Sequence, residues 1–316
     1  MLSALSRRHA LAGGFCLCCL PAALRAASAA PGTGPFVTEE VAPGLHIRHG
    51  IDQDASAGND DAIANIGFII GREAVLVADP GGSLADGERL RASIREKSQL
   101  PIRYVSMSHV HPDHIFGAGA FRQDDPVFIG HARLVQALAQ RGAFYQQGLE
   151  SILGPGKAGP VVMPTMTVAD HAEVDLGGRV IALTAHGPAH TDNDLSLIDR
   201  QTGTLLPADL LFVRRMPSLD GSLTGWLKEL AALKALPTPR VVPGHGPVAM
   251  DWPAASADLE RYLNILLRET REAVSSGVDI SVAAGSVAAS ERGKWALYDD
   301  YNGRNVTEAY KELEWE

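Results

Sequence analysis

The stretch that decides the fold is residues 102–114, which read IRYVSM followed by SHVHPDH. The first six residues predict a strand, and four residues of metal-ligand type follow directly at its carboxyl end. Side chains alternate in an extended segment, so His109 and His111 point to the same side and can share one metal. Pro112 imposes a turn, after which Asp113 and His114 can face a second metal. Imidazole nitrogens and carboxylate oxygens are donors that suit zinc, at distances of about 2.0–2.2 Å.

The alternative interpretation of this cluster is a turn that happens to be rich in histidine and binds no metal. Closely packed imidazoles repel one another when they are protonated, and they add nothing to an apolar core. A bound cation accounts for every member of the cluster, so the sequence favours a metal site.

The rest of the chain predicts a mixed α/β fold in which strands come first. Residues 254–313 read as helical, and we expect them to close the fold rather than to form a second domain. The expected elements are a hairpin over 36–48, strands over 63–70 and 74–78, a helix over 83–97, the strand 102–107, a helix over 132–153, a β-rich stretch over 161–212, a helix over 223–236 and a strand over 240–242.

The motif at 109–114 resembles the HxHxDH motif of the metallo-β-lactamase superfamily. The similarity continues at residues 187–191 (GPAHT), 208–210 (ADL) and 243–246 (PGHG). The resemblance implies a four-layer αββα sandwich whose two zinc ions lie at one edge. It also implies seven ligands, with Asp209 bridging the two ions: His109, His111, Asp113, His114, His190, Asp209 and His245.

The resemblance further implies a zinc-dependent hydrolase. Zinc lowers the pKa of bound water from about 15.7 to about 7, which makes hydroxide available at neutral pH. Asp113 would be both a ligand and the catalytic residue that orients this nucleophile. The expected substrate is a small molecule with an ester, thioester, lactone or related carbonyl group. Lactam-cleaving members typically have cysteine or serine where this chain has Asp209, so a β-lactamase is disfavoured.

Three other functions remain open. The first is a periplasmic metallo-β-lactamase. The second is an iron-dependent persulfide dioxygenase, which needs only two histidines and an aspartate and leaves Asp113, His114 and His245 unexplained. The third is a non-catalytic metal accessory protein, which requires a closed coordination sphere.

Residues 1–29 predict an export signal peptide, which leaves residues 30–316 as the hydrolase domain. Arg7 and Arg8 precede an apolar run over 10–24, and an A-x-A cleavage pattern follows at 27–29. The arginine pair resembles a twin-arginine signal, whose substrates cross the membrane already folded. We therefore expect a periplasmic protein whose mature chain has no membrane span.

Composition narrows the function classes further. Hydrophobic residues make up 46% and charged residues 21% of the chain, as in a soluble folded domain. All three cysteines, Cys16, Cys18 and Cys19, lie inside the predicted signal, so the mature chain has no disulfide and no thiolate ligand. Removing residues 1–29 removes three arginines and no acid, which changes the net charge from −9 to −12. A protein this acidic is a poor nucleic-acid binder.

A narrower resemblance is to the quinoprotein relay system zinc metallohydrolases. The leader, residues 61–71 and residues 217–223 are similar to that group, and they imply a functional link to a periplasmic quinoprotein dehydrogenase. For the substrate, Arg214 and Arg215 follow Asp209 closely and are candidates to bind a carboxylate. Residues 56–61 are a candidate loop over the site.

Two features of the remaining sequence have both a functional and a structural interpretation. Phe144 and Tyr145 on the predicted helix either line the pocket or belong to the core. His186 is a candidate hydrogen-bond partner for a ligating imidazole. The other histidines of the mature chain outside the predicted ligand set are expected to be structural or on the surface: His46, His49, His131 and His171.

Overall fold

The computed structural model describes residues 36–316, so the predicted signal peptide lies outside the described residues. The first sheet is built from the amino-terminal half of the domain and ends in three parallel pairings. Its seven strands lie in chain order: β1 (Glu39–Ala42), β2 (Leu45–Arg48), β3 (Ile66–Ile70), β4 (Val75–Ala78), β5 (Ile102–Met107), β6 (Val127–His131) and β7 (Met166–Val168).

The second sheet has six strands, and only β11 and β12 pair in parallel. In spatial order they are β13 (Met250–Asp251), β12 (Arg240–His245), β11 (Thr204–Phe212), β10 (Leu195–Asp199), β9 (Val180–Ala185) and β8 (His171–Asp175).

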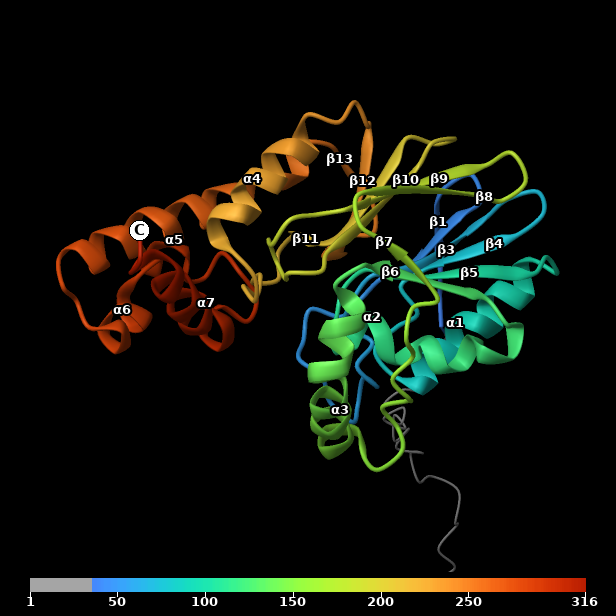
Figure 1. Cartoon of the computed structure of the whole chain (residues 1–316), viewed down its shortest axis with the longest axis horizontal. Helices are drawn as coiled ribbons and strands as arrows, with labels where there is room; N and C mark the ends of the chain where they lie inside the picture. Colours follow the sequence, from blue (N-terminus) through green and yellow to red (C-terminus); the bar gives the residue numbers. More distant parts are fainter. Residues whose placement is uncertain (1–35) are drawn as a thin grey trace, which may run out of the picture.

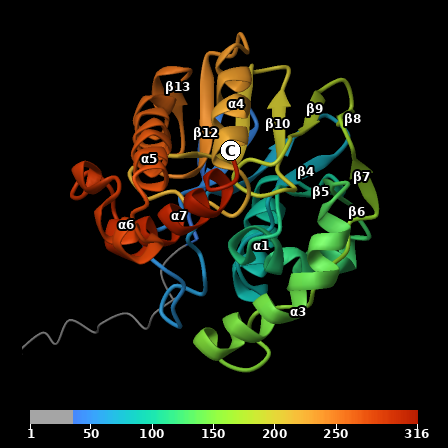
Figure 2. The ribbon, with the colours of Figure 1, turned by 60° about the vertical axis from the view of Figure 1, so that its left-hand side comes forward.

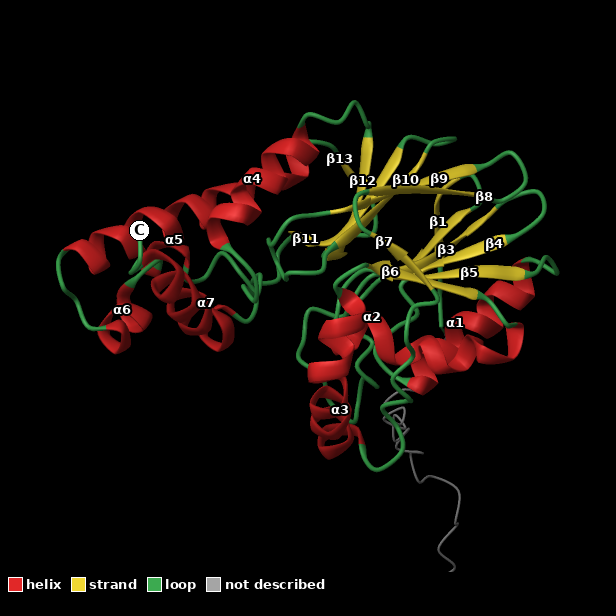
Figure 3. Ribbon diagram, in the orientation of Figure 1, coloured by secondary structure: helices red, strands yellow, loops and turns green. Residues whose placement is uncertain are grey.

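Helices flank the two sheets on their outer faces (Figures 1 and 3). α1 (Leu84–Lys97), α2 (Pro112–Ile115) and α3 (Leu134–Leu153) lie on the side of the first sheet. α4 (Leu223–Lys234), α5 (Ala257–Ser275), α6 (Ile280–Ser286) and α7 (Tyr298–Leu313) lie on the side of the second. Figure 2 shows α4 and α5 in front of the second sheet.

Three apolar clusters define the interfaces between these four layers. Alternate residues of a strand face opposite sides of its sheet. Leu76 accordingly packs between the two sheets with Leu197 of β10, whereas Val75 and Val77 pack against the helices of the first layer. On the far side of the second sheet, Leu205 packs with Trp226 of α4 and Tyr262 of α5. The predicted four-layer αββα sandwich is confirmed.

The predicted elements agree with the structure except at their ends. The helix predicted from 132 begins at Leu134, and the strand predicted to end at 242 continues to His245. Residues 254–313 are mainly helical, in separate helices packed against α4 and one another. Among the described residues, no helix combines the length and apolar character needed to span a membrane.

Candidate metal centre

The loop after β5 carries the first ligands because the chain changes conformation there. His111 is extended, with φ −70° and ψ 147°, and Pro112 occupies the first turn of the short helix α2. Proline is favoured at this position because its fixed φ fits a helix and its missing N–H has no partner to lose. Asp113 and His114 lie on α2 and therefore face a different point from His109 and His111.

The remaining ligands come from the second sheet. His190 lies in the connection between β9 and β10, and His245 is the last residue of β12. Asp209 lies within β11, which continues past it to Phe212. The strand is irregular at Ala208, which has φ +47°, and the register of its pairing with β12 shifts there.

Gly244 allows Asp209 to approach the strand beside it. A Cβ at this glycine would lie 2.0 Å from Asp209 Oδ1, which is less than any real contact. Glycine is therefore required here by the position of the carboxylate, and not by an unusual φ angle.

The first group of donors consists of His109, His111, His190 and Asp209. Nε2 of His190 lies 3.0 Å from Nδ1 of His111 and 3.3 Å from Nε2 of His109. Nε2 of His109 lies 3.1 Å from Nδ1 of His111. Four donors around a tetrahedral zinc at about 2.0–2.1 Å are separated by about 3.3 Å. The three nitrogens therefore have the spacing of one face of such a site.

The second group consists of Asp113, His114 and His245, and Asp209 lies between the groups. Asp209 Oδ1 is 3.1 Å from His114 Nε2, and its Oδ2 is 3.4 Å from both His190 and His245 Nε2. One carboxylate thus contacts imidazoles of both groups, which is the arrangement expected of a bridging ligand.

The tautomers of two imidazoles follow from their outer hydrogen bonds. His190 Nδ1 lies 2.6 Å from the carbonyl oxygen of Ser218, and His245 Nδ1 lies 3.0 Å from that of Ile63. A carbonyl oxygen only accepts, so each Nδ1 must carry the proton and donate it. The Nε2 of each ring therefore presents a lone pair to the centre, as a metal ligand does.

The other three imidazoles are oriented by carboxylates. His114 Nδ1 lies 2.8 Å from Asp79 Oδ2, and His111 Nε2 lies 3.2 Å from Asp220 Oδ2. Ser108 donates its hydroxyl proton to Asp79 and accepts from His109 Nδ1 at 3.0 Å. Burial by itself raises the pKa of Asp220, but hydrogen bonds from His111 and Arg141 outweigh it and lower that pKa to about 2. Asp220 is therefore an ionised acceptor.

The protein atoms alone leave the centre unsatisfied. His114 Nε2 and Asp209 Oδ1 are buried and lie 3.1 Å apart, but neither makes a well-aligned hydrogen bond, and an unsatisfied buried polar atom is costly. Burial lowers the pKa of His190 to about 3, so that ring is neutral. Burial also opposes protonation of His114, but the Asp209, Asp113 and Asp79 carboxylates outweigh it and raise its pKa well above the usual range. These donors therefore fit a divalent metal.

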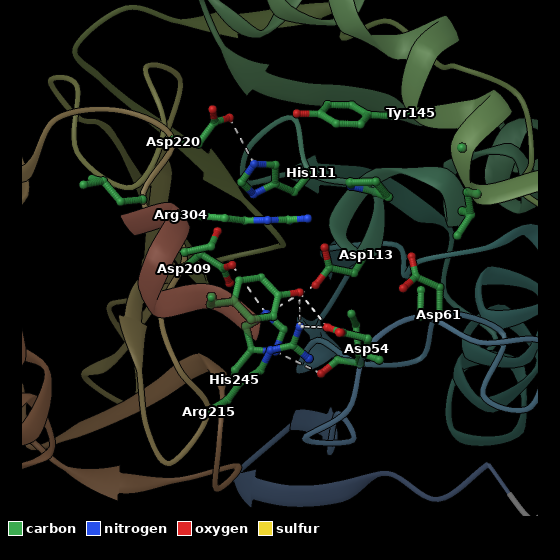
Figure 4. Close-up of a pocket in the computed structure, with 18 of the residues that line it drawn as sticks. Asp54, Asp61, His111, Asp113, Tyr145, Asp209, Arg215, Asp220, His245 and Arg304 are labelled. Carbon is green, nitrogen blue, oxygen red and sulfur yellow. Dashed lines mark hydrogen bonds and ion pairs between the residues drawn. The ribbon is translucent and has the colours of Figure 1, made fainter. Parts of the chain in front are cut away.

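A cavity of about 880 Å³ opens above the two groups, and Figure 4 shows the residues around it. Arg215 lines the cavity, but Arg214 is exposed and outside it. Of the predicted loop over the site, Asp61 reaches the cavity together with Asp54 and Ala55 just before it. Phe144 and Tyr145 also belong to its lining, as the functional interpretation of helix α3 predicted.

Several functional residues were missed from the sequence, and one hypothesis was wrong. His186 bonds Glu229 and Ser196 rather than a ligating imidazole. The imidazoles are oriented instead by Asp79 and Asp220. Asp79 does have a sequence signal, because it directly follows the apolar strand β4, next to the strand that leads into the motif.

Comparison with known proteins agrees with this site. The sequence model of the metallo-beta-lactamase superfamily matches residues 59–245, which include every predicted ligand. The chain therefore belongs to the metallo-β-lactamase superfamily. Its two donor groups give it a candidate site for a divalent metal within the fold of that superfamily.

Two curated relatives are similar to the chain. The linear primary-alkylsulfatase of Pseudomonas sp. (strain ATCC 19151) is 22% identical over 240 residues, which cover 64% of this chain and 44% of that protein. The uncharacterized protein YobT of Bacillus subtilis (strain 168) is 24% identical over 127 residues, which cover 39% of this chain and 52% of that protein. The chain thus spans about half the length of these relatives.

Solved structures share the fold. The metallo-beta-lactamase from Pontibacter korlensis matches with a TM-score of 0.59 and 17% identity over 72% of this chain and 98% of that one. A structure of TMB-1, solved to examine the role of its own residues 119 and 228 in substrate and inhibitor binding, matches with a TM-score of 0.58 and 15% identity. The match covers 73% of this chain and 98% of that one.

Proposed function

We propose that the protein is a dinuclear zinc hydrolase that cleaves an ester, thioester, lactone or related carbonyl substrate. The observation that carries the proposal is the orientation of the imidazoles. Each of the five donates its outer N–H to a fixed acceptor and presents its other nitrogen to the centre. Two groups of donors joined by Asp209 provide for two metal ions rather than one.

Zinc bound by these residues supplies an activated hydroxide and polarises the scissile carbonyl. The protein's part is to fix the reactants. Asp113 Oδ2 lies 3.3 Å from His245 Nε2 and borders the cavity, so Asp113 is placed to orient the nucleophile as well as to bind metal. In the overall reaction water adds to the carbonyl carbon, the bond to the leaving oxygen or sulfur breaks, and a carboxylate and an alcohol or thiol are released.

The same features rank the other candidates. Asp209 stands where the lactam-cleaving members typically have cysteine or serine, which opposes a β-lactamase. The complete second group opposes a mononuclear iron dioxygenase. The cavity above both groups gives access to the centre and opposes a closed accessory site. Sulfate-ester hydrolysis is a second candidate, because a similar protein is named a linear primary-alkylsulfatase.

We further propose that the protein is exported to the periplasm by its predicted twin-arginine signal and serves a quinoprotein dehydrogenase pathway there. Support comes from the sequence of residues 1–29 and from the resemblance described above. A fusion in which Arg7 and Arg8 are replaced by lysine should remain in the cytoplasm, whereas normal export of that fusion would contradict the twin-arginine route.

Metal analysis of protein reconstituted with zinc tests the proposed function. We expect about two zinc ions per chain, about one in His245→Ala, and two in the control His171→Ala, whose side chain is 69% exposed. Chelation should abolish cleavage of activated esters, thioesters and lactones in the wild type. Iron as the bound metal, or penicillin turnover faster than ester turnover, would contradict the proposal.

A further inference from the structure

The cavity above the metal centre has two chemically different walls (Figure 4). One wall belongs to α3 and is largely apolar: Phe144, Leu149 and Ile152 line the cavity. Phe144 is 73% and Ile152 is 45% exposed, so both offer apolar surface to a ligand in the cavity. The opposite wall belongs to α7 and carries Arg304.

Arg304 differs from Arg215 and Glu308, two other charged residues of this lining. Arg215 bonds the carbonyl oxygen of Gln53, the carboxylate of Asp54 and the hydroxyl of Tyr301. Glu308 is paired with Lys311. By contrast, Arg304 has no hydrogen bond and no ion pair anywhere in residues 36–316, and only the ring of Tyr301, at 6.0 Å, lies beneath its guanidinium.

Arg304 lines the same cavity as His111 and Asp209, and in the view of Figure 4 its side chain is drawn between theirs. A guanidinium offers several donors in a plane and matches the oxygens of a carboxylate or sulfate. The ring of Tyr301, whose hydroxyl donates to Asp54 at 2.6 Å, lies 6.0 Å from the Arg304 guanidinium. Arg304 is thus a cation at the rim of the metal-centre cavity with no hydrogen bond or ion pair among residues 36–316, and it is available to a ligand.

We propose that the pocket selects esters that combine an apolar chain, packed on α3, with an anionic group bound by Arg304. The inference rests on the proposed hydrolase function and names its substrate class. The anionic group is either a carboxylate remote from the scissile bond or the scissile sulfate ester itself, and both have the same complementarity to a guanidinium.

Matched esters test the charge. The zinc-loaded protein should cleave the mono-4-nitrophenyl ester of adipic acid with a lower KM than 4-nitrophenyl hexanoate, which lacks the carboxylate. Arg304→Gln should raise KM about 10-fold for the charged ester only, with kcat unchanged. Arg304→Lys should restore part of the loss. The control Arg268→Gln, whose side chain is 60% exposed on α5, should change neither ester.

A sulfate arm distinguishes the two anionic groups. If the anion is the scissile sulfate, Arg304→Gln should reduce sulfate release from dodecyl sulfate while leaving the adipate ester unaffected. For the apolar wall, Phe144→Ser should reduce the preference for octanoate over butanoate esters. Equal cleavage of every charged and neutral substrate by wild type and Arg304→Gln would overturn the inference.

A binding measurement separates this inference from the proposed function. Calorimetry of the zinc-loaded protein should show that 6-phenylhexane-1-sulfonate binds about 10-fold more weakly to Arg304→Gln, whereas 6-phenylhexan-1-ol binds both proteins equally. Failure to cleave any ester would reject the proposed function alone, and the calorimetry would still decide the role of Arg304. Equal sulfonate binding by the two proteins would reject the inference.

Discussion

The carboxylate of Asp79 lies 2.8 Å from Nδ1 of His114 and 2.8 Å from the hydroxyl of Ser108, on the side of the imidazoles that faces away from the centre. Asp79 thereby orients His114 directly and His109 through Ser108. A residue that touches no ligand atom of the centre thus fixes one imidazole in each group.

Asp79→Asn should weaken metal binding about 10- to 100-fold, because the amide offers one acceptor where the carboxylate offers two. Competition with a chromogenic chelator measures the change. Asp170→Asn, whose side chain is 85% exposed, is the control. Unchanged zinc affinity in Asp79→Asn would mean that backbone packing alone positions the two rings.

Gly244→Ala should displace Asp209, because the added Cβ would lie 2.0 Å from its Oδ1. We expect loss of tightly bound metal together with a lower Tm, measured by metal analysis and thermal unfolding. Gly285→Ala on α6 is the matched control, since no atom lies within 4 Å of its added Cβ. Full metal content in Gly244→Ala would show that β12 can move away from β11 without displacing Asp209.

Arg215→Gln should loosen the contact between the loop before β3 and α7. Arg215 joins Gln53 and Asp54 of that loop to Tyr301 of α7 and is itself buried. Faster amide hydrogen exchange in residues 51–62 and 298–304 is the expected result. Exchange confined to one of the two segments would show that the other is held independently.

Glu291 should make the carboxyl-terminal helices sensitive to acid. Although burial raises the pKa of this carboxyl, hydrogen bonds from Arg261, Lys294 and Trp295 outweigh it and lower the pKa to about 2 from 4.5. A lowered pKa in the folded state stabilises the protein above pH 4.5, and this contribution is lost as pH falls from 4.5 to 2.

Removing the carboxylate tests this linkage. Glu291→Gln should reduce the free energy of unfolding by about 2 kcal/mol at neutral pH, because it removes the charged acceptor of the buried Trp295 and of the more exposed Arg261 and Lys294. Urea unfolding at pH 7 and pH 3 should show a smaller difference for the variant than for the wild type. The exposed Glu272→Gln should behave as the wild type does.

The sequence predicted the ligands better than their surroundings. The grouping of His109 and His111 apart from Asp113 and His114 followed from strand alternation and from Pro112, both of which are local. The continuation of β11 through Asp209 could not be predicted, because it depends on pairing with β12 and on the space left by Gly244.

The residues that surround the ligands depend on long-range contacts. Asp220 reaches His111 only because the loop after β11 folds back over β5, and Arg304 reaches the cavity only because α7 packs beside that loop, where Asn305 bonds Leu219. Asp220 lies in the segment 217–223 noted in the sequence, but nothing there indicates its contact with His111, and Arg304 has no comparable signal. Arg214 and Arg215 show the same limit, since adjacent arginines face opposite environments.

The donors of each group come from both halves of the sandwich. In the first group, His109 and His111 follow β5 of the first sheet, whereas His190 and Asp209 come from the half that holds the second sheet. In the second group, Asp113 and His114 lie on α2 and His245 ends β12. Neither half by itself holds a complete site. Tight binding of a metal by either group would therefore report that the two halves have been correctly assembled.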